Sequence, residues 1–168
     1  MVQHADIDHT GLPGVPGGAG AIDTVHLTAD ETGATTATLQ NTSLSFAVVN
    51  GSYYMFRFYC LMRSTGTSVG LKFGLTTPAF TTFGALARIP ILVGSAGTSS
   101  GEVQGAITAS GEFLVTGAVP TANLDYLCTI EGTILPSADG TLMLQYAAET
   151  TGQTVTLRRG SAGELITL

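Results

Sequence analysis

Short runs in which apolar and polar residues alternate recur along this chain, and they constrain its fold more than any other feature. Residues 43–48, 124–131 and 141–146 alternate with a period of two, which is the period of a half-buried β-strand. Turn signals separate such runs roughly every 8–14 residues, and no amphipathic helical pattern interrupts them. The pattern predicts an all-β protein with about eight core strands, a jelly-roll-like β-sandwich with an extended N-terminal arm.

One predicted strand, at residues 53–63, is too apolar to have a solvated face. Its even positions are wholly apolar, whereas its odd positions mix Tyr, Met and Leu with Arg57 and Arg63. A strand that is apolar on both faces is typical of the middle of a sheet whose outer face is also covered. We expect the cover to be either the segment of residues 21–50 or another subunit.

Two dipeptides predict tight turns, and one proline predicts a sheet edge. Asn50-Gly51 follows an alternating run and is the strongest two-residue hairpin signal, and Ser110-Gly111 is a second two-residue turn. Pro90 interrupts an apolar run. Because proline has no backbone N–H to donate to a neighbouring strand, it favours an edge position for that run.

The beginning of the chain differs from the rest, and it suggests three parts. Residues 1–24 include Pro13, Pro16 and several glycines, which cannot sustain a helix, so we expect an extended docking arm. Twenty extended residues reach at most ~65–70 Å, enough to cross onto a neighbouring subunit. Residues 25–50 are expected to form a connecting segment with one or two strands, and residues 51–168 the β-sandwich domain.

The charge balance argues against nucleic acid as a partner and for protein partners. The chain has twelve Asp and Glu against six Lys and Arg, a net charge of −6, and the first 51 residues contain no Lys or Arg. Phosphate binding needs clustered cations, which are missing here. Charged residues make up only 11% of the chain and hydrophobic residues 44%, so we expect part of the apolar surface to contact another protein.

The cysteines and the apolar runs predict where the chain is made. Cys60 and Cys128 lie inside apolar strand patterns, so we expect two buried thiols in a protein made in a reducing cytoplasm, with a disulfide between neighbouring strands as the alternative. No signal-peptide pattern is visible at the N-terminus, and no run approaches 18 uninterrupted apolar residues. We therefore expect no membrane partner.

The residue types disfavour catalysis. All three histidines, His4, His9 and His26, precede the predicted sandwich, so the sandwich cannot supply the imidazole of a Ser-His-Asp triad. Neither cysteine has a cationic neighbour in sequence that would lower its pKa. We expect neither an enzyme nor a bound cofactor.

The cluster of His4, Asp6, Asp8 and His9 permits two interpretations. Imidazole and carboxylate are good ligands for zinc or manganese, and Asp6 and Asp8 would point the same way in an extended segment. However, no rigid frame holds them, and Asp side chains commonly accept backbone hydrogen bonds in turns. We favour a docking strap and expect no metal.

Arg158-Arg159 is the one adjacent basic pair in the chain. It is either a solvated strand end or, as a sharper hypothesis, a site that meets acidic arm residues of a neighbouring subunit.

The segment His-Ala-Asp-Ile-Asp-His-Thr-Gly-Leu-Pro-Gly-Val-Pro-Gly resembles the N-terminal segments of tailed-phage structural proteins, where it precedes a small β-domain. Residues 54–63, 70–76, 140–147 and 155–161 are similar to the same family. The resemblance covers most of residues 4–18 and 52–168. In such proteins the β-domain is jelly-roll-like and commonly trimeric, and it sits on the virion as a head decoration (cement) protein or as a tail or fibre component.

The resemblance implies a capsid decoration protein, made in the host cytoplasm and placed on the outer surface of a phage head. Its partners would be the major capsid protein and two further copies of itself in a homotrimer. The alternative is a tail, baseplate or fibre component that binds a receptor or glycan, with Phe80, Phe83 and Tyr126 as candidate sugar contacts. The expected capsid- or subunit-binding residues are His4, Asp6, Ile7, Asp8, His9, Leu12, Pro13, Val15, Pro16, Arg158 and Arg159.

Overall fold

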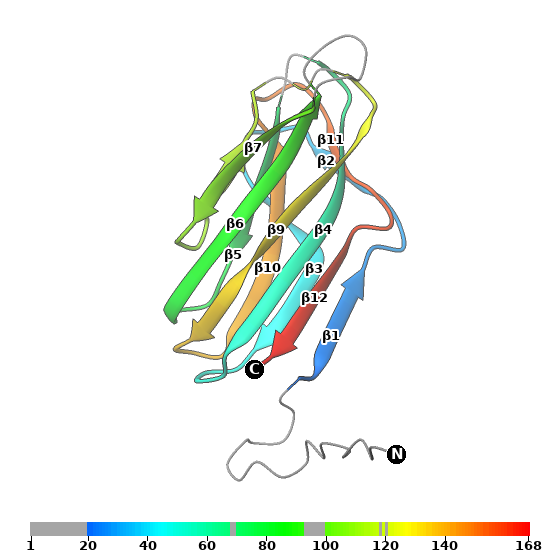
Figure 1. Cartoon of the computed structure of the whole chain (residues 1–168). Coiled ribbons are helices and arrows are strands. Elements are labelled where there is room, and N and C mark those ends of the chain that lie inside the picture. The colour runs from blue at the N-terminus through cyan, green and yellow to red at the C-terminus, as the bar shows by residue number, and fades with distance from the viewer. Residues whose placement is uncertain (1–19, 68–69, 93–99, 118, 120) are drawn as a thin grey trace, which may run out of the picture.

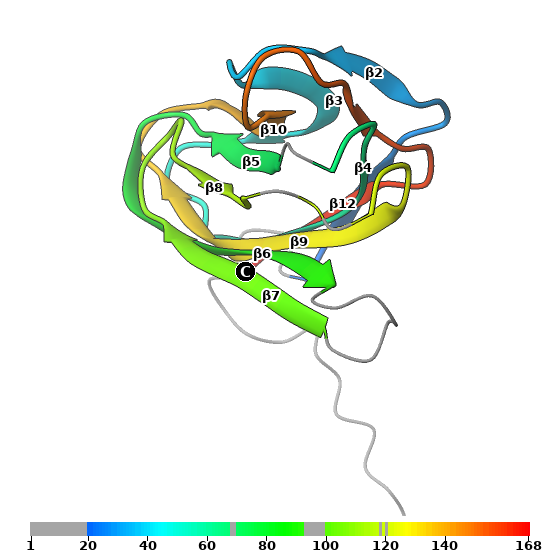
Figure 2. The same cartoon turned by 90° about the horizontal axis from the view of Figure 1, so that it is seen from above.

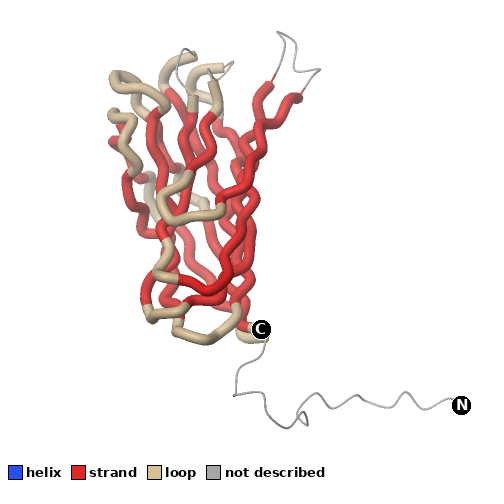
Figure 3. Tube along the Cα trace, turned by 90° about the vertical axis from the view of Figure 1, so that its left-hand side faces the viewer, coloured by secondary structure: helices blue, strands red, loops and turns tan. Residues whose placement is uncertain are grey.

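The computed structural model describes residues 20–67, 70–92, 100–117, 119 and 121–168, and this part of the chain consists of strands joined by turns and loops (Figures 1 and 3). No helix in these residues is long and apolar enough to cross a bilayer. The strands are β1 (Ile22–His26), β2 (Glu31–Ala34), β3 (Gln40–Val48), β4 (Tyr54–Ser64), β5 (Leu71–Thr76), β6 (Phe80–Leu92), β7 (Ser100–Ile107), β8 (Phe113–Val115), β9 (Asp125–Pro136), β10 (Gly140–Ala148), β11 (Val155–Leu157) and β12 (Ala162–Thr167).

The strands form two antiparallel sheets that pack face to face (Figure 2). The larger sheet has the order β1-β12-β4-β9-β6-β7, with β11 pairing β4 and β2 pairing β11, and the smaller has the order β3-β10-β5-β8. Without β2, β6, β7 and β11, the strands β1-β12-β4-β9 face β3-β10-β5-β8, which is the order of a jelly roll. The predicted all-β, jelly-roll-like sandwich is therefore confirmed, whereas most of the predicted N-terminal arm, residues 1–19, lies outside the described residues.

The core lies between the two sheets, and β4 is its central strand. The even positions of β4 from Tyr54 to Met62 are at most 5% exposed, as predicted from their apolar character. The ring of Phe58 lies 5.6 Å from that of Phe46 on β3, so it joins the two sheets. Burial of a large apolar side chain contributes roughly 1.5–3 kcal/mol, so this row is a main source of stability.

Both predicted two-residue turns exist as turns, but neither closes a hairpin. Gly51 and Gly111 have positive φ, +77° and +82°, as such turns require. However, β3 and β4 belong to different sheets, and so do β7 and β8. The hairpin expected at Asn50-Gly51 is therefore wrong: each turn carries the chain from one layer of the sandwich to the other.

The edge position predicted from Pro90 is also wrong for the strand as a whole. β6 lies between β9 and β7. The pairing of β6 with β9 ends at Arg88, whereas its pairing with β7 continues through Pro90, opposite Glu102. Pro90 thus lies where the strand has a neighbour on one side only, which is the local condition that proline needs.

The residues expected to form the end of the arm and the connecting segment contribute strands to both sheets. β1 pairs with β12 in the larger sheet. β3 pairs with β10 in the smaller sheet, and its Leu44, Phe46 and Val48 are buried in the core.

The two cysteines are directly opposite each other on β4 and β9, and both are free thiols with no exposed surface. Burial raises the pKa of both Cys60 and Cys128 above the usual range of a thiol. We therefore expect neither thiol to react with a maleimide in the folded protein, and both to react once it is unfolded in guanidinium. Mass spectrometry counts the labels, and rapid labelling of the native protein would contradict the burial.

Glu112 caps the turn that leads into β8. One of its carboxylate oxygens accepts hydrogen bonds from the backbone N–H groups of Thr108, at 2.6 Å, and Ala109, at 2.9 Å, and these bonds lower its pKa. A carboxyl whose pKa is lowered by folding stabilises the folded state above its unfolded pKa, about 4.3, and loses this contribution as the pH falls through the folded pKa. We expect Glu112→Gln to unfold at lower urea concentration than the unchanged protein at pH 7, and the difference to shrink at pH 3. An equal difference at both pH values would contradict this cap.

Candidate functional site

Nine of the eleven predicted binding residues lie outside the described residues. They are His4, Asp6, Ile7, Asp8, His9, Leu12, Pro13, Val15 and Pro16. The metal and strap interpretations of this cluster therefore both stay predictions. The first residues that the structure describes are Gly20, whose N–H donates to the carbonyl oxygen of Thr167, and Ala21, which leads into β1.

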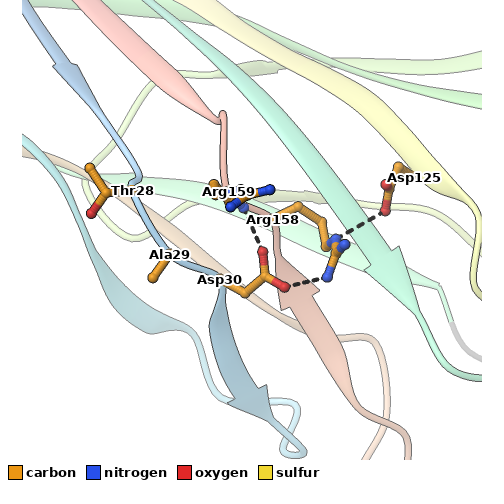
Figure 4. Close-up of a pocket in the computed structure, with 6 residues that line it drawn as sticks. All are labelled: Thr28, Ala29, Asp30, Asp125, Arg158 and Arg159. Atoms are coloured by element: carbon orange, nitrogen blue, oxygen red, sulfur yellow. Dashed lines mark hydrogen bonds and ion pairs between the residues drawn. The ribbon is translucent and has the colours of Figure 1, made fainter.

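Arg158 and Arg159 lie in the turn between β11 and β12, at a surface pocket of about 380 Å³ (Figure 4). The turn is built by local bonds: Gly160 has a φ of +91°, and the hydroxyl of Ser161 donates to the carbonyl oxygen of Arg158. The pocket is lined by Thr28, Ala29, Asp30, Asp125, Arg158 and Arg159.

The charge of Arg158 is already paired within the chain. Its guanidinium contacts a carboxylate oxygen of Asp30, and its Nε lies 3.4 Å from Oδ1 of Asp125. Asp125 also accepts two bonds from Arg63, with the Nε–Oδ1 distance at 2.7 Å, and these bonds raise the pKa of Arg63. Arg158 therefore joins the segment before β2 to β9 and has little remaining charge to offer a partner.

Arg159 differs from its neighbour. Its backbone N–H donates to Oδ1 of Asp30 at 2.7 Å, but its side chain is exposed and forms no ion pair with another described residue. Of the predicted pair, Arg159 is thus the cation that remains open to an acidic partner.

The structure also shows a charged surface that the sequence analysis did not identify. The outer face of the larger sheet, the side turned away from the core, is formed by odd positions on β4 and β9 and by even positions on β1, β12, β6 and β7. A row of alternating charges crosses it from β12 to β7, made by Glu164, Arg57, Glu131, Arg88 and Glu102.

The contacts in this charge row join four neighbouring pairs of strands. Arg57 Nη2 lies 2.7 Å from Glu131 Oε2, and Arg57 Nη1 lies 3.8 Å from Glu164 Oε1. Arg88 Nη1 lies 3.5 Å from Glu131 Oε1, and Arg88 Nε lies 3.8 Å from Glu102 Oε1. Hydrogen bonds to Tyr59 and Glu131 raise the pKa of Arg57. Because Arg57 and Glu131 are 74 residues apart, only the sheet register reveals the row.

Apolar side chains flank the charge row and remain exposed. Met55 is 45% exposed, Tyr59 39% and Leu127 52%. The segment of residues 21–50 does not cover them, because β1 extends the same sheet at its edge, β3 lies in the opposite sheet and β2 pairs with β11. Of the two covers expected for this face, the one from within the chain is therefore wrong.

The three aromatic residues expected to contact a sugar do not form an exposed platform. Tyr126 is 3% exposed, and its hydroxyl bonds to the backbone of Thr121. Phe80 and Phe83 pack against the core, with their ring centroids 5.1 Å apart. These residues serve the packing of the sandwich instead.

The described residues form two surfaces with side chains suited to binding a partner. The pocket beside Arg159 presents a cation, and the outer face presents apolar side chains around a row of paired charges. Within the same residues, no group of three or more His, Cys, Asp and Glu is placed to hold a metal ion.

The fold and these two surfaces define the chain as a jelly-roll β-sandwich whose larger sheet has an outer face that no other described strand covers. No family model matches the sequence, and no curated protein matches it. Among solved structures, a chain in the structure of the infectious bursal disease virus Gx strain aligns with 99% of this chain at 11% identity and a TM-score of 0.18. The alignment covers 46% of that chain, so this chain spans less than half of its length. A likeness at that TM-score carries no argument about function.

Proposed function

We propose that this chain is a capsid decoration protein, which binds the outer surface of a phage head as a homotrimer and stabilises the shell. The observation that carries the proposal is the division of the chain between a β-sandwich with its own core and a preceding segment of different chemistry. Among the described residues, the buried core cluster begins at Leu27, and Val25 packs against it. Residues 1–19 contain two prolines and several glycines and no Lys or Arg, and they resemble phage virion segments.

One feature of the body supports binding through the preceding segment. β1 is the outermost strand on its side of the larger sheet, so among the described strands it pairs with β12 alone and leaves one edge open. Such an edge suits strand addition, in which backbone hydrogen bonds supply affinity. Three arms linked in one trimer would add avidity, because each further contact forms at high effective concentration.

The shell would gain strength through the added contacts. Internal DNA pressure separates neighbouring capsid subunits, and an arm that lies across their boundary must be detached before they part. The low positive charge of the chain fits a partner made of protein on the outside of the head rather than the DNA within it.

Removal of residues 2–19 tests the proposal. We expect the shortened protein to keep the oligomeric mass of the full chain and to lose affinity for purified heads by about a hundredfold or more, because linked contacts contribute that much avidity. Co-sedimentation with heads measures the binding. As a matched pair, Ile7→Ser with Leu12→Ser in the full chain should weaken binding, whereas Val49→Ser, in an exposed turn of the body, should not.

Saturation of heads by the shortened protein would refute the role of the arm. The number of copies per virion separates head from tail: hundreds of copies support decoration, and a handful would favour the tail, baseplate or fibre alternative.

A further inference from the structure

The outer face of the larger sheet combines apolar exposure with paired charge. Met55 and Ile166 lie on one side of the charge row, and Tyr59, Leu61 and Leu127 lie on the other. Central strands that are apolar on both faces occur in sheets that are covered on both sides. The described residues leave this side open, so its apolar side chains are available for contact with a partner.

We propose that the partner is a further copy of this chain, and that the outer faces line a rotation axis that runs parallel to the strands, in front of β4 and β9. This inference rests on the homotrimer of the proposed function and assigns its interface. The faces would then meet as layers of side chains around the axis, with their apolar residues removed from water.

The order of the charges favours this axis. The midline of the face lies between β4 and β9, and β12 and β6 are the next strands on either side of it. A rotation about an axis parallel to the strands brings β4 of one copy toward β9 of the next, and β12 toward β6. Arg57 then approaches Glu131 of the next copy.

The rotation also places opposite charges together on the second pair of strands, β12 of one copy and β6 of the next. Glu164 on β12 approaches Arg88 on β6, whose guanidinium already reaches back along its strand to Glu131. An axis across the strands would instead bring each strand against its own copy and oppose Arg57 with Arg57. Like charges in contact at an interface repel, so of these two axes the row favours the parallel one.

The test places a charge at the apolar part of this face. Leu127→Lys changes a side chain that is 52% exposed, so the fold should tolerate it, and Val49→Lys is the matched control because Val49 is 54% exposed and lies in a turn away from the face. We expect the full chain and Val49→Lys to be trimers by light scattering. Leu127→Lys should raise the trimer dissociation constant at least ~30-fold, as expected for a central interface residue.

A second variant tests the charge row. Arg57→Glu places a glutamate where it faces Glu131 of its own chain and of the next copy, so we expect it to dissociate the trimer as well, with an unchanged circular dichroism spectrum. Trimers of undiminished stability in both variants would overturn the inference, and so would a monomeric full chain at micromolar concentration.

Head binding, measured in parallel, separates this inference from the proposed function. A trimeric full chain that ignores heads would refute decoration and leave the interface standing. If Leu127→Lys stays trimeric and loses head binding, the outer face docks on the capsid instead, and the interface proposed here is wrong.

Discussion

Replacing Gly132 by alanine is expected to destabilise the protein by ~3 kcal/mol, the upper part of the range for overpacked cores. Gly132 lies on β9 between β4 and β6, opposite Phe56 and Ala85. A Cβ there would lie 2.8 Å from Cζ of Phe56 and 2.8 Å from Cα of Ala85, and it would also collide with the carbonyl oxygen of Gly84. Two of these atoms belong to the backbone of a paired strand, so they cannot move without disturbing the sheet.

Gly84→Ala is the matched control for this prediction. Gly84 lies on the neighbouring strand β6, opposite Thr133, and a Cβ at this position would meet nothing within 4 Å. We expect its free energy of unfolding to stay within about 0.5 kcal/mol of the unchanged protein. Urea unfolding followed by circular dichroism measures both variants. Equal stability of the two would show that β9 and β6 are not packed as closely as the structure has them.

Phe58→Ala is expected to cost about 3–5 kcal/mol, the usual loss for a fully buried aromatic residue. Phe58 is 0% exposed, and its ring lies against Phe46 on the opposite sheet and 6.2 Å from the ring of Phe56. Gly163 on β12 leaves the space that this ring needs, because a Cβ there would lie 2.7 Å from Cδ1 of Phe58. Gly163 therefore has no side chain that could move into the cavity left by the ring.

Phe113→Ala provides the comparison on the other sheet. Phe113 is 47% exposed, and its ring lies 4.5 Å from Nζ of Lys72. An exposed cation–π contact contributes about 0.5–1 kcal/mol, so we expect a loss of that size. Denaturant midpoints compare the two variants, and a loss at Phe58 no greater than that at Phe113 would contradict the central place of β4 in the core.

Hydrophobic alternation predicted the fold class and the buried side of its main strand from the sequence. The even positions of β4 are buried because a strand turns alternate side chains to opposite faces, and this rule needs no tertiary information. Composition likewise predicted that the strand would be apolar on both faces. The structure added that no described strand covers the outer face, which directs attention to another copy.

Turn chemistry predicted where the chain reverses but not which strands it joins. Gly51 has the positive φ that glycine favours in such a turn, whereas Asn50 does not have the positive φ that a type I′ hairpin turn needs at both positions. A positive φ at the glycine serves a hairpin and a crossing between sheets alike, so the dipeptide in the sequence does not distinguish them. Long-range packing decides, since β3 pairs with β10 and β4 pairs with β9 and β12.

For the candidate surfaces, too, the sequence determined one part and only the tertiary structure determined the other. The sequence by itself determined an all-β body, its apolar central strand and the acidic, proline- and glycine-containing segment before it, because these follow from residue type and short-range period. Only the tertiary structure decided that Arg158 is paired with Asp30 and Asp125, and that Glu164, Arg57, Glu131, Arg88 and Glu102 form one row. The physical reason is register: charges distant in sequence become neighbours only when specific strands pair, and that pairing is set by the packing of the whole core.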